Sequence, residues 1–190
     1  MAFPWQTIRS ANLATGHIVE DMKLGLDLAL AGTPPMFCPH ALVYSHFPSS
    51  AEGVQSQRTR WEHGHLSVIA SAAPAALFGA IRRRSASLFA FGLDLCVPPL
   101  ALLVLLVCAL TGLSLLLAVF GGPVAPLLLG VLAGAALGVA ILLSWWRHGR
   151  AVLSGKELAL AVVYVLAKIP LYFRFLFRRQ VSWVRSKRDS

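Results

Sequence analysis

Charged residues are scarce in this sequence. Only 13% of the 190 residues are Asp, Glu, Lys or Arg, against about 25% in an ordinary soluble domain, whereas 57% are hydrophobic. The low charge excludes a conventional soluble globule, and the high hydrophobicity excludes an intrinsically disordered chain. Acidic residues are the rarer kind, with 8 against 17 Lys and Arg. This composition indicates a membrane protein.

Metal-binding patterns are also lacking. The three cysteines, Cys38, Cys96 and Cys108, are too far apart in sequence for a metal clip. His63 and His65 lie two residues apart, so on a helix they point to nearly opposite faces and cannot easily share an ion. We therefore predict no metal site in this chain. We also predict no nucleic-acid partner, because the basic residues cluster beside apolar segments and suit the headgroups of a lipid bilayer.

The longest stretch without charge or histidine runs from residue 95 to residue 146. A membrane-spanning helix needs about 20 apolar residues, so this stretch is long enough for two helices and a turn. Gly121, Gly122 and Pro123 interrupt the run of Leu, Val and Ala. The sequence thus predicts transmembrane helices near 95–119 and 124–146.

Basic residues flank this pair of helices on both sides. Arg82–Arg84 precede it, Arg147 and Arg150 follow it, and the connecting turn has none. The positive-inside tendency places both flanks in the cytoplasm and the turn outside. We therefore expect a multi-pass protein of the cell (inner) membrane, with its front part and its C-terminus cytoplasmic.

The segment 156–180 is apolar but includes Lys168, Pro170 and Arg174. A charge at the centre of the bilayer costs at least about 2.5 kcal/mol. We therefore predict an amphipathic helix that lies in the cytoplasmic interface and precedes a basic tail. A third complete crossing is the alternative, because long basic side chains can reach the interface from within a helix.

The front part, residues 1–80, has the pattern of a mixed α/β fragment. Acidic residues at 20 and 21 and a Gly-x-Pro-Pro stop at 32–35 predict a helix over 20–31. The apolar run 41–44 predicts a buried strand, and Ser49-Ser-Ala-Glu52 has the spacing of a capping box. The predicted organisation is a cytoplasmic domain at 1–80, a transmembrane hairpin at 81–150 and an interfacial helix with a basic tail at 151–190.

Gln57, Arg60 and Trp61 would share one face of the second helix, because they stand at positions i, i+3 and i+4. Arginine can hold a diphosphate through two parallel hydrogen bonds, and glutamine adds a directed donor. Tryptophan offers a flat face on which a sugar ring can stack. A solvated helix with one buried tryptophan is the alternative that these residues leave open.

The segment Gln57-Arg-Thr-Arg-Trp61 resembles the Gln-x-x-Arg-Trp motif of membrane-embedded family 2 glycosyltransferases. This group includes cellulose, hyaluronan and poly-N-acetylglucosamine synthases. Val19-Glu-Asp21 resembles the Thr-Glu-Asp motif of the same enzymes, with Val in place of Thr. The resemblance covers roughly the whole chain, as the C-terminal half of such an enzyme. It implies that residues 1–80 are the C-terminal part of a GT-A-type catalytic domain.

The resemblance also implies roles for these residues. Asp21 would be the general base that takes a proton from the acceptor hydroxyl, with Glu20 as a supporting neighbour. Gln57 and Arg60 would hold the leaving diphosphate of a nucleotide-sugar donor, and Trp61 would stack on the acceptor sugar. The acceptor would be a polysaccharide or a glycolipid at the cytoplasmic face of the bilayer.

A complete enzyme of this kind uses a divalent metal, Mg²⁺ or Mn²⁺, bound by an upstream half with Asp-rich motifs. Residues 1–19 contain no acidic side chain, so we expect the metal ligands to lie outside this chain. We accordingly expect the 190 residues alone to be unable to turn over a nucleotide sugar. The alternative to an enzyme is a small non-catalytic membrane protein, either an accessory subunit or a decayed relic of such a transferase.

Overall fold

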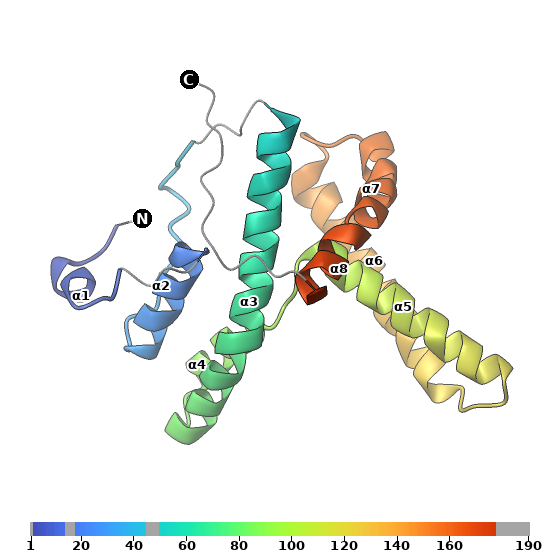
Figure 1. Cartoon of the computed structure of the whole chain (residues 1–190), viewed down its shortest axis with the longest axis horizontal. Helices are drawn as coiled ribbons and strands as arrows, with labels where there is room; N and C mark the ends of the chain where they lie inside the picture. The colour runs from blue at the N-terminus through green and yellow to red at the C-terminus, as the bar shows by residue number, and fades with distance from the viewer. Residues whose placement is uncertain (1, 14–17, 45–49, 178–190) are drawn as a thin grey trace. The chain divides into compact units, whose positions relative to one another are not determined.

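The computed structural model describes residues 2–13, 18–44 and 50–177, and these are helical without any β-strand. Figure 1 labels the elements along the chain. In order, they are α1 (Trp5–Arg9), α2 (Glu20–Leu30), α3 (Ala51–Arg83), α4 (Ala86–Leu95), α5 (Leu100–Val119), α6 (Ala125–Ser144), a π-helical turn (Trp145–Gly149), α7 (Gly155–Ala167) and α8 (Ile169–Phe177). Residues Met1–Pro98 form one compact unit and Pro99–Leu176 form another.

The predicted α/β fragment is therefore wrong. The run 41–44 has no regular structure, and Leu42, Val43 and Tyr44 are 73–87% exposed. A strand exists only through hydrogen bonds to a neighbouring strand, and no other segment among the described residues supplies one. Residues 41–44 are apolar as the prediction required, but no described segment pairs with them as a second strand.

The helix starts and stops of the first unit follow the sequence more closely. Helix α2 covers Glu20–Leu30 and is followed by Gly32 at a φ of 91°, a left-handed conformation that glycine adopts without strain. Helix α3 begins one residue later than the capping box suggested. Its N-cap is Ser50, whose Oγ accepts a hydrogen bond from the Gly53 amide at 3.1 Å; Ser49 lies outside the described residues.

Helices α2, α3 and α4 pack together in the first unit (Figure 1). The chain reverses after α3 at Arg84, which has a φ of 51°, and α4 folds back along the end of α3. Close packing of α3 and α4 is visible at Gly92, where an added Cβ would lie 2.8 Å from Leu77 Cδ2. The three helices share a small apolar core made of Val19, Leu26, Val68, Ala73, Ala76 and Leu95.

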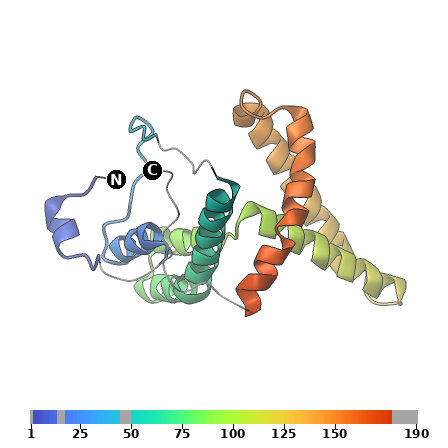
Figure 2. The ribbon, with the colours of Figure 1, turned by 45° about the horizontal axis from the view of Figure 1, so that its top comes forward.

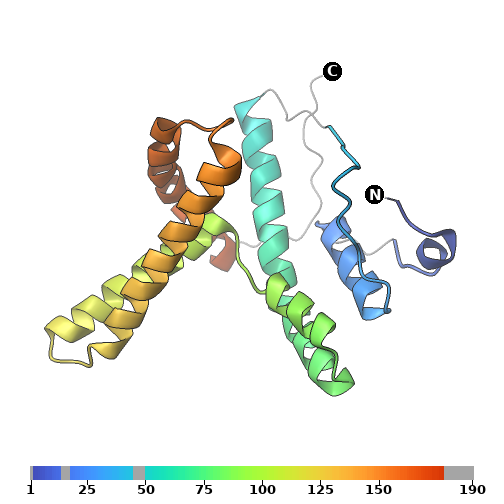
Figure 3. The same cartoon turned by 180° about the vertical axis from the view of Figure 1, so that it is seen from behind.

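The second unit contains an antiparallel hairpin of α5 and α6, which Figures 2 and 3 show from two sides. Its turn is made by Gly121, with a φ of 84°, and by the Gly122 amide, which donates to the Leu117 carbonyl at 2.8 Å. Gly130 of α6 lies against Thr111 of α5, because an added Cβ would be 2.6 Å from Thr111 Oγ1. The two helices predicted near 95–119 and 124–146 are thus present, within a few residues of their expected ends.

Helix α7 follows a short connection that is fixed at both ends. The Trp145 indole donates to the Leu153 carbonyl at 2.8 Å. Ser154 and Glu157 form a capping box, in which each side chain bonds the other residue's backbone amide. Helices α7 and α8 are separated only by Lys168, whose ammonium lies 4.8 Å from the ring centre of Tyr164.

Among the described residues, four helical segments are long and apolar enough to cross a membrane, not the two that the sequence suggested. They are Ala51–Arg83, Leu100–Val119, Ala125–Gly149 and Gly155–Phe177. The first was missed because the polar start of α3 continues without a break into an apolar second half. The last was assigned to the interface because Lys168 and Arg174 lie within it. In the structure α7 and α8 include this stretch, with only Lys168 between the two helices. This count identifies a membrane protein.

Candidate functional site

The two motif segments lie on neighbouring helices of the first unit. Glu20 and Asp21 form the first turn of α2, and both are exposed. Gln57, Arg60 and Trp61 lie in the N-terminal half of α3. Helix α2 packs against α3, so the fold brings together segments separated by more than 30 residues of sequence.

The contact between these helices is closest where α2 begins. Val19, the N-cap residue of α2, is buried with its side chain against Gly64 of α3. At the other end, the Arg83 guanidinium donates a hydrogen bond of 2.7 Å to the Leu30 carbonyl, one of the last carbonyls of α2. Helix α2 therefore runs parallel to the second half of α3 and is held at both ends.

This arrangement places the motif of α3 beyond the N-terminal end of α2. From the level of Gly64, Arg60 lies about 6 Å and Gln57 about 10 Å further along the α3 axis, at 1.5 Å per residue. Both residues share a face with Gly64, because Arg60 precedes it by four residues and Gln57 by seven, about one and two helical turns. The exposed carboxylates of α2 and the α3 motif therefore border the same region of the first unit.

Gln57 has a buried polar atom. Its Oε1 is shielded from solvent and has no hydrogen-bond partner among the described residues. A buried acceptor left unpaired costs about 1–3 kcal/mol, so such atoms call for an explanation. An amide at this position can accept from a sugar hydroxyl or donate to a phosphate oxygen.

Trp61 is 45% exposed, although it is a large aromatic residue. The alternative of a solvated helix with a buried tryptophan is therefore wrong for this side chain. An indole that keeps half of its surface open can receive a flat ligand. Arg60, one residue earlier, is half-buried.

The Asp21 carboxylate is engaged with its own helix. Its Oδ1 accepts a hydrogen bond of 2.9 Å from the Met22 amide. Val19 has no side-chain oxygen and makes no capping hydrogen bond, so the first turn of α2 relies on this carboxylate. The same carboxylate remains exposed and accessible to a partner.

Gly64 was not singled out from the sequence. It completes an i, i+3, i+4, i+7 series with Gln57, Arg60 and Trp61. A glycine inside a helix is less stable than alanine by about 1 kcal/mol, so its presence often marks a close backbone approach. That reasoning would have identified Gly64 as a contact position.

The residues described here do not supply a metal site. No group of three or more His, Cys, Asp and Glu side chains lies together in the described parts of the chain. His63 is 2% exposed and His65 is half-buried on the same helix. The divalent metal that the resemblance implies therefore does not fit these residues.

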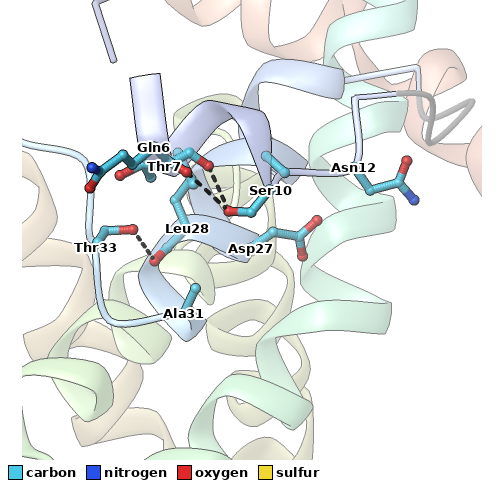
Figure 4. A pocket seen from close by; sticks show the side chains of 9 residues that line it. Gln6, Thr7, Ser10, Asn12, Asp27, Leu28, Ala31 and Thr33 are labelled. Atoms are coloured by element: carbon cyan, nitrogen blue, oxygen red, sulfur yellow. Dashed lines mark hydrogen bonds between the residues drawn. The ribbon is translucent and has the colours of Figure 1, made fainter. Parts of the chain in front are cut away.

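A separate hollow of about 440 Å³ lies between α1 and α2 (Figure 4). Its polar groups are largely used to hold the chain itself. Ser10 Oγ donates to the Thr7 carbonyl at 3.0 Å, Thr33 Oγ1 donates to the Leu28 carbonyl at 3.2 Å, and Asp27 is paired with Lys23. None of the motif residues lines this hollow, so it is distinct from the candidate site.

Comparison with known proteins adds one finding. A model of the glycosyl transferase family group 2 matches residues 1–177. Neither curated proteins nor solved structures gave a significant match. The match includes both motif segments and all four apolar helical segments.

Proposed function

We propose that this chain, which belongs to the glycosyl transferase family group 2, carries the acceptor side of a transferase that uses a nucleotide sugar. The observation that carries the proposal is the packing of Val19 on Gly64. This contact joins the start of α2, which holds the exposed carboxylates, to the helix that holds Gln57, Arg60 and Trp61. The acceptor is a polysaccharide or a glycolipid, and transfer takes place at the cytoplasmic face of the membrane.

Asp21 is the proposed general base. A carboxylate within hydrogen-bond reach of an acceptor hydroxyl can take its proton, and the Asp21 side chain is exposed at the start of α2. As the acceptor oxygen attacks the anomeric carbon, its proton passes to Asp21 and the bond to the diphosphate breaks. Glu20 adds negative charge beside it.

The α3 motif is the proposed binding surface for the two substrates. The Arg60 guanidinium compensates the charge of the leaving diphosphate through paired hydrogen bonds. The Gln57 amide can donate a hydrogen bond to the diphosphate, and Trp61 offers its exposed ring to the acceptor sugar. These groups bind and orient, whereas Asp21 moves the proton.

The test is the replacement Asp21→Asn in membranes of cells that make the native transferase, so that the donor-binding half expected outside these 190 residues is present. Nucleoside diphosphate release is followed with UDP- and GDP-linked hexoses as donors. Loss of a general base lowers the rate by about 10²–10⁴-fold, and we expect a loss in this range. The matched control is Asp27→Asn, which makes the same chemical change on the same helix but at a residue paired with Lys23; its rate should stay within about two-fold.

Two results contradict the proposal. One is an Asp21→Asn variant that keeps the rate of the Asp27→Asn control, and the other is a native protein that releases nucleoside diphosphate from none of these donors. Either result favours the alternative of a non-catalytic membrane protein within this family.

A further inference from the structure

Gly64 lies where α3 approaches the start of α2 most closely. A Cβ added to Gly64 would stand 2.3 Å from Val19 Cγ1, 3.0 Å from Cγ2 and 3.2 Å from Cβ. Carbon atoms in good contact are separated by about 3.5–4.0 Å. Both residues are buried, so the space cannot be regained by turning a side chain into solvent. Any residue larger than glycine at position 64 therefore moves the start of α2.

Such a movement would be local, because α2 is also held elsewhere. Leu26 belongs to the core that includes Val68, and the Leu30 carbonyl is bound by Arg83. These contacts lie further along α2 and do not involve Gly64. A side chain at position 64 would therefore displace the first turn of α2 while the rest of the helix keeps its place.

The first turn of α2 holds Glu20 and Asp21, and Gly64 shares a face of α3 with Gln57 and Arg60. A rigid helix keeps Gly64 at a fixed distance from those two residues. We infer that Gly64 is a positioning residue: its bare backbone sets the spacing between the carboxylate of Asp21 and the binding face of α3. This inference rests on the proposed function for its catalytic consequence, but the contact itself can be tested without activity.

The first experiment compares two glycines of the same helix. Gly64→Ala places a methyl group against Val19, whereas Gly79→Ala adds the same group where nothing lies within 4 Å. Misplacing a catalytic group by about 1 Å can reduce the rate by about 10²-fold. We expect kcat to fall at least ten-fold in Gly64→Ala with KM for the donor nearly unchanged, and both constants to stay within two-fold in Gly79→Ala. Equal kinetics for the two variants overturn the inference.

The second experiment seeks rescue at the partner residue. Val19→Ala removes Cγ1 and Cγ2, the two atoms nearest to the added methyl group. In the double variant Gly64→Ala/Val19→Ala, we expect kcat to return to within three-fold of the Val19→Ala single variant. Residues in contact show this kind of coupling, whereas independent effects simply multiply. A double variant that combines both losses overturns the inference.

The third experiment tests the contact without an assay of transfer. After Cys38, Cys96 and Cys108 are replaced by Ser, cysteines are introduced at Val19 and Gly64. The two Cβ positions are 3.2 Å apart, close to the range of about 3.5–4.5 Å found in disulfides. We expect mild oxidation in membranes to link Val19→Cys to Gly64→Cys, as detected by peptide mass spectrometry. Val19→Cys with Gly79→Cys should stay unlinked, because Gly79 is about 22 Å further along α3.

These readouts separate two kinds of failure. In one case, the disulfide forms while Asp21→Asn leaves the rate of transfer unchanged. That result supports the contact between Val19 and Gly64 and contradicts the catalytic role of Asp21. In the opposite case, transfer depends on Asp21, but no disulfide forms and Gly64→Ala has no effect on kcat. That result supports the proposed transferase function and overturns the positioning role of Gly64.

Discussion

At the scale of single residues, Val19 combines two effects. It begins α2 without a capping hydrogen bond, so the Met22 amide bonds the Asp21 carboxylate instead. It also fills the contact with Gly64. The residue that departs from the Thr-Glu-Asp pattern is thus tied both to the proposed base and to the helix that faces it.

Replacing Val19 by Thr should return a capping oxygen. Serine and threonine caps stabilise a helix by about 0.5–2 kcal/mol relative to a residue that cannot cap. The new hydroxyl can accept from the Met22 amide and release the Asp21 carboxylate. We expect a higher midpoint of thermal unfolding in detergent and transfer at least as fast as in the parent protein.

The comparison for this prediction is Val19→Ala, which has no capping oxygen and fewer packing atoms. It should unfold at a lower temperature than the parent protein. If the midpoint of thermal unfolding of Val19→Thr is no higher than that of Val19→Ala, the capping hydrogen bond is not formed.

Sequence reasoning placed the motif residues correctly on two helices but did not foresee how these helices meet. The spacing of Gln57, Arg60 and Trp61 fixes their shared face whatever surrounds them. The contact of Val19 with Gly64 depends on tertiary packing, which no local pattern encodes. The exposure of the Trp61 side chain likewise depends on whether other segments of the chain pack over it.

At the scale of elements, the α5–α6 hairpin shows how closely two apolar helices can approach. Gly130 faces Thr111 so tightly that an added Cβ would meet its Oγ1 at 2.6 Å, whereas Gly138 of the same helix has nothing within 4 Å. In the bilayer, where lipid tails compete with apolar side chains, small residues at such contacts drive helix association.

The two glycines make a matched pair of variants. Gly130→Ala should separate the helices and lower the midpoint of thermal unfolding in detergent. Gly138→Ala should leave that midpoint unchanged or raise it, because alanine is the better helix former by about 1 kcal/mol. Equal midpoints for the two variants would contradict the packing at Thr111.

The elements that sequence patterns foresaw are those with strong local determinants. Helix α2 has acidic residues at its start and glycine at its end, and the α5–α6 pair has an uninterrupted apolar composition. Helix α4 was not predicted. Only two residues separate it from α3, namely Arg84 in a left-handed conformation and the N-cap residue Ser85, and neither is a strong break in the sequence. The strand at 41–44 failed because its pattern requires a partner from elsewhere.

At the scale of the whole molecule, the placement of charge predicts the orientation in the membrane. The turn between α5 and α6 has no charge, whereas Arg147 and Arg150 follow α6. The positive-inside tendency puts the turn outside and these arginines in the cytoplasm. The number of helices long and apolar enough to cross was harder to foresee, since α3 and α7–α8 mix polar and apolar stretches.

Single cysteines in a cysteine-free background test this orientation. Pro123→Cys, in the turn, should react with a membrane-impermeant maleimide on intact cells. Ala151→Cys, in the connection after α6, should react only after the membrane is permeabilised. The opposite pattern would reverse the assigned orientation and place the basic flank outside.

The contact between Val19 and Gly64 also limits how the sequences of related proteins can change during evolution. Because the Val19 side chain fills the space that a side chain at position 64 would need, neither position can change freely while the other stays fixed. A larger residue becomes acceptable at position 64 only in a lineage that has already shortened residue 19. We therefore expect substitutions at these two sites to occur in a set order, which links the Val19-Glu-Asp21 motif to a position outside both motifs.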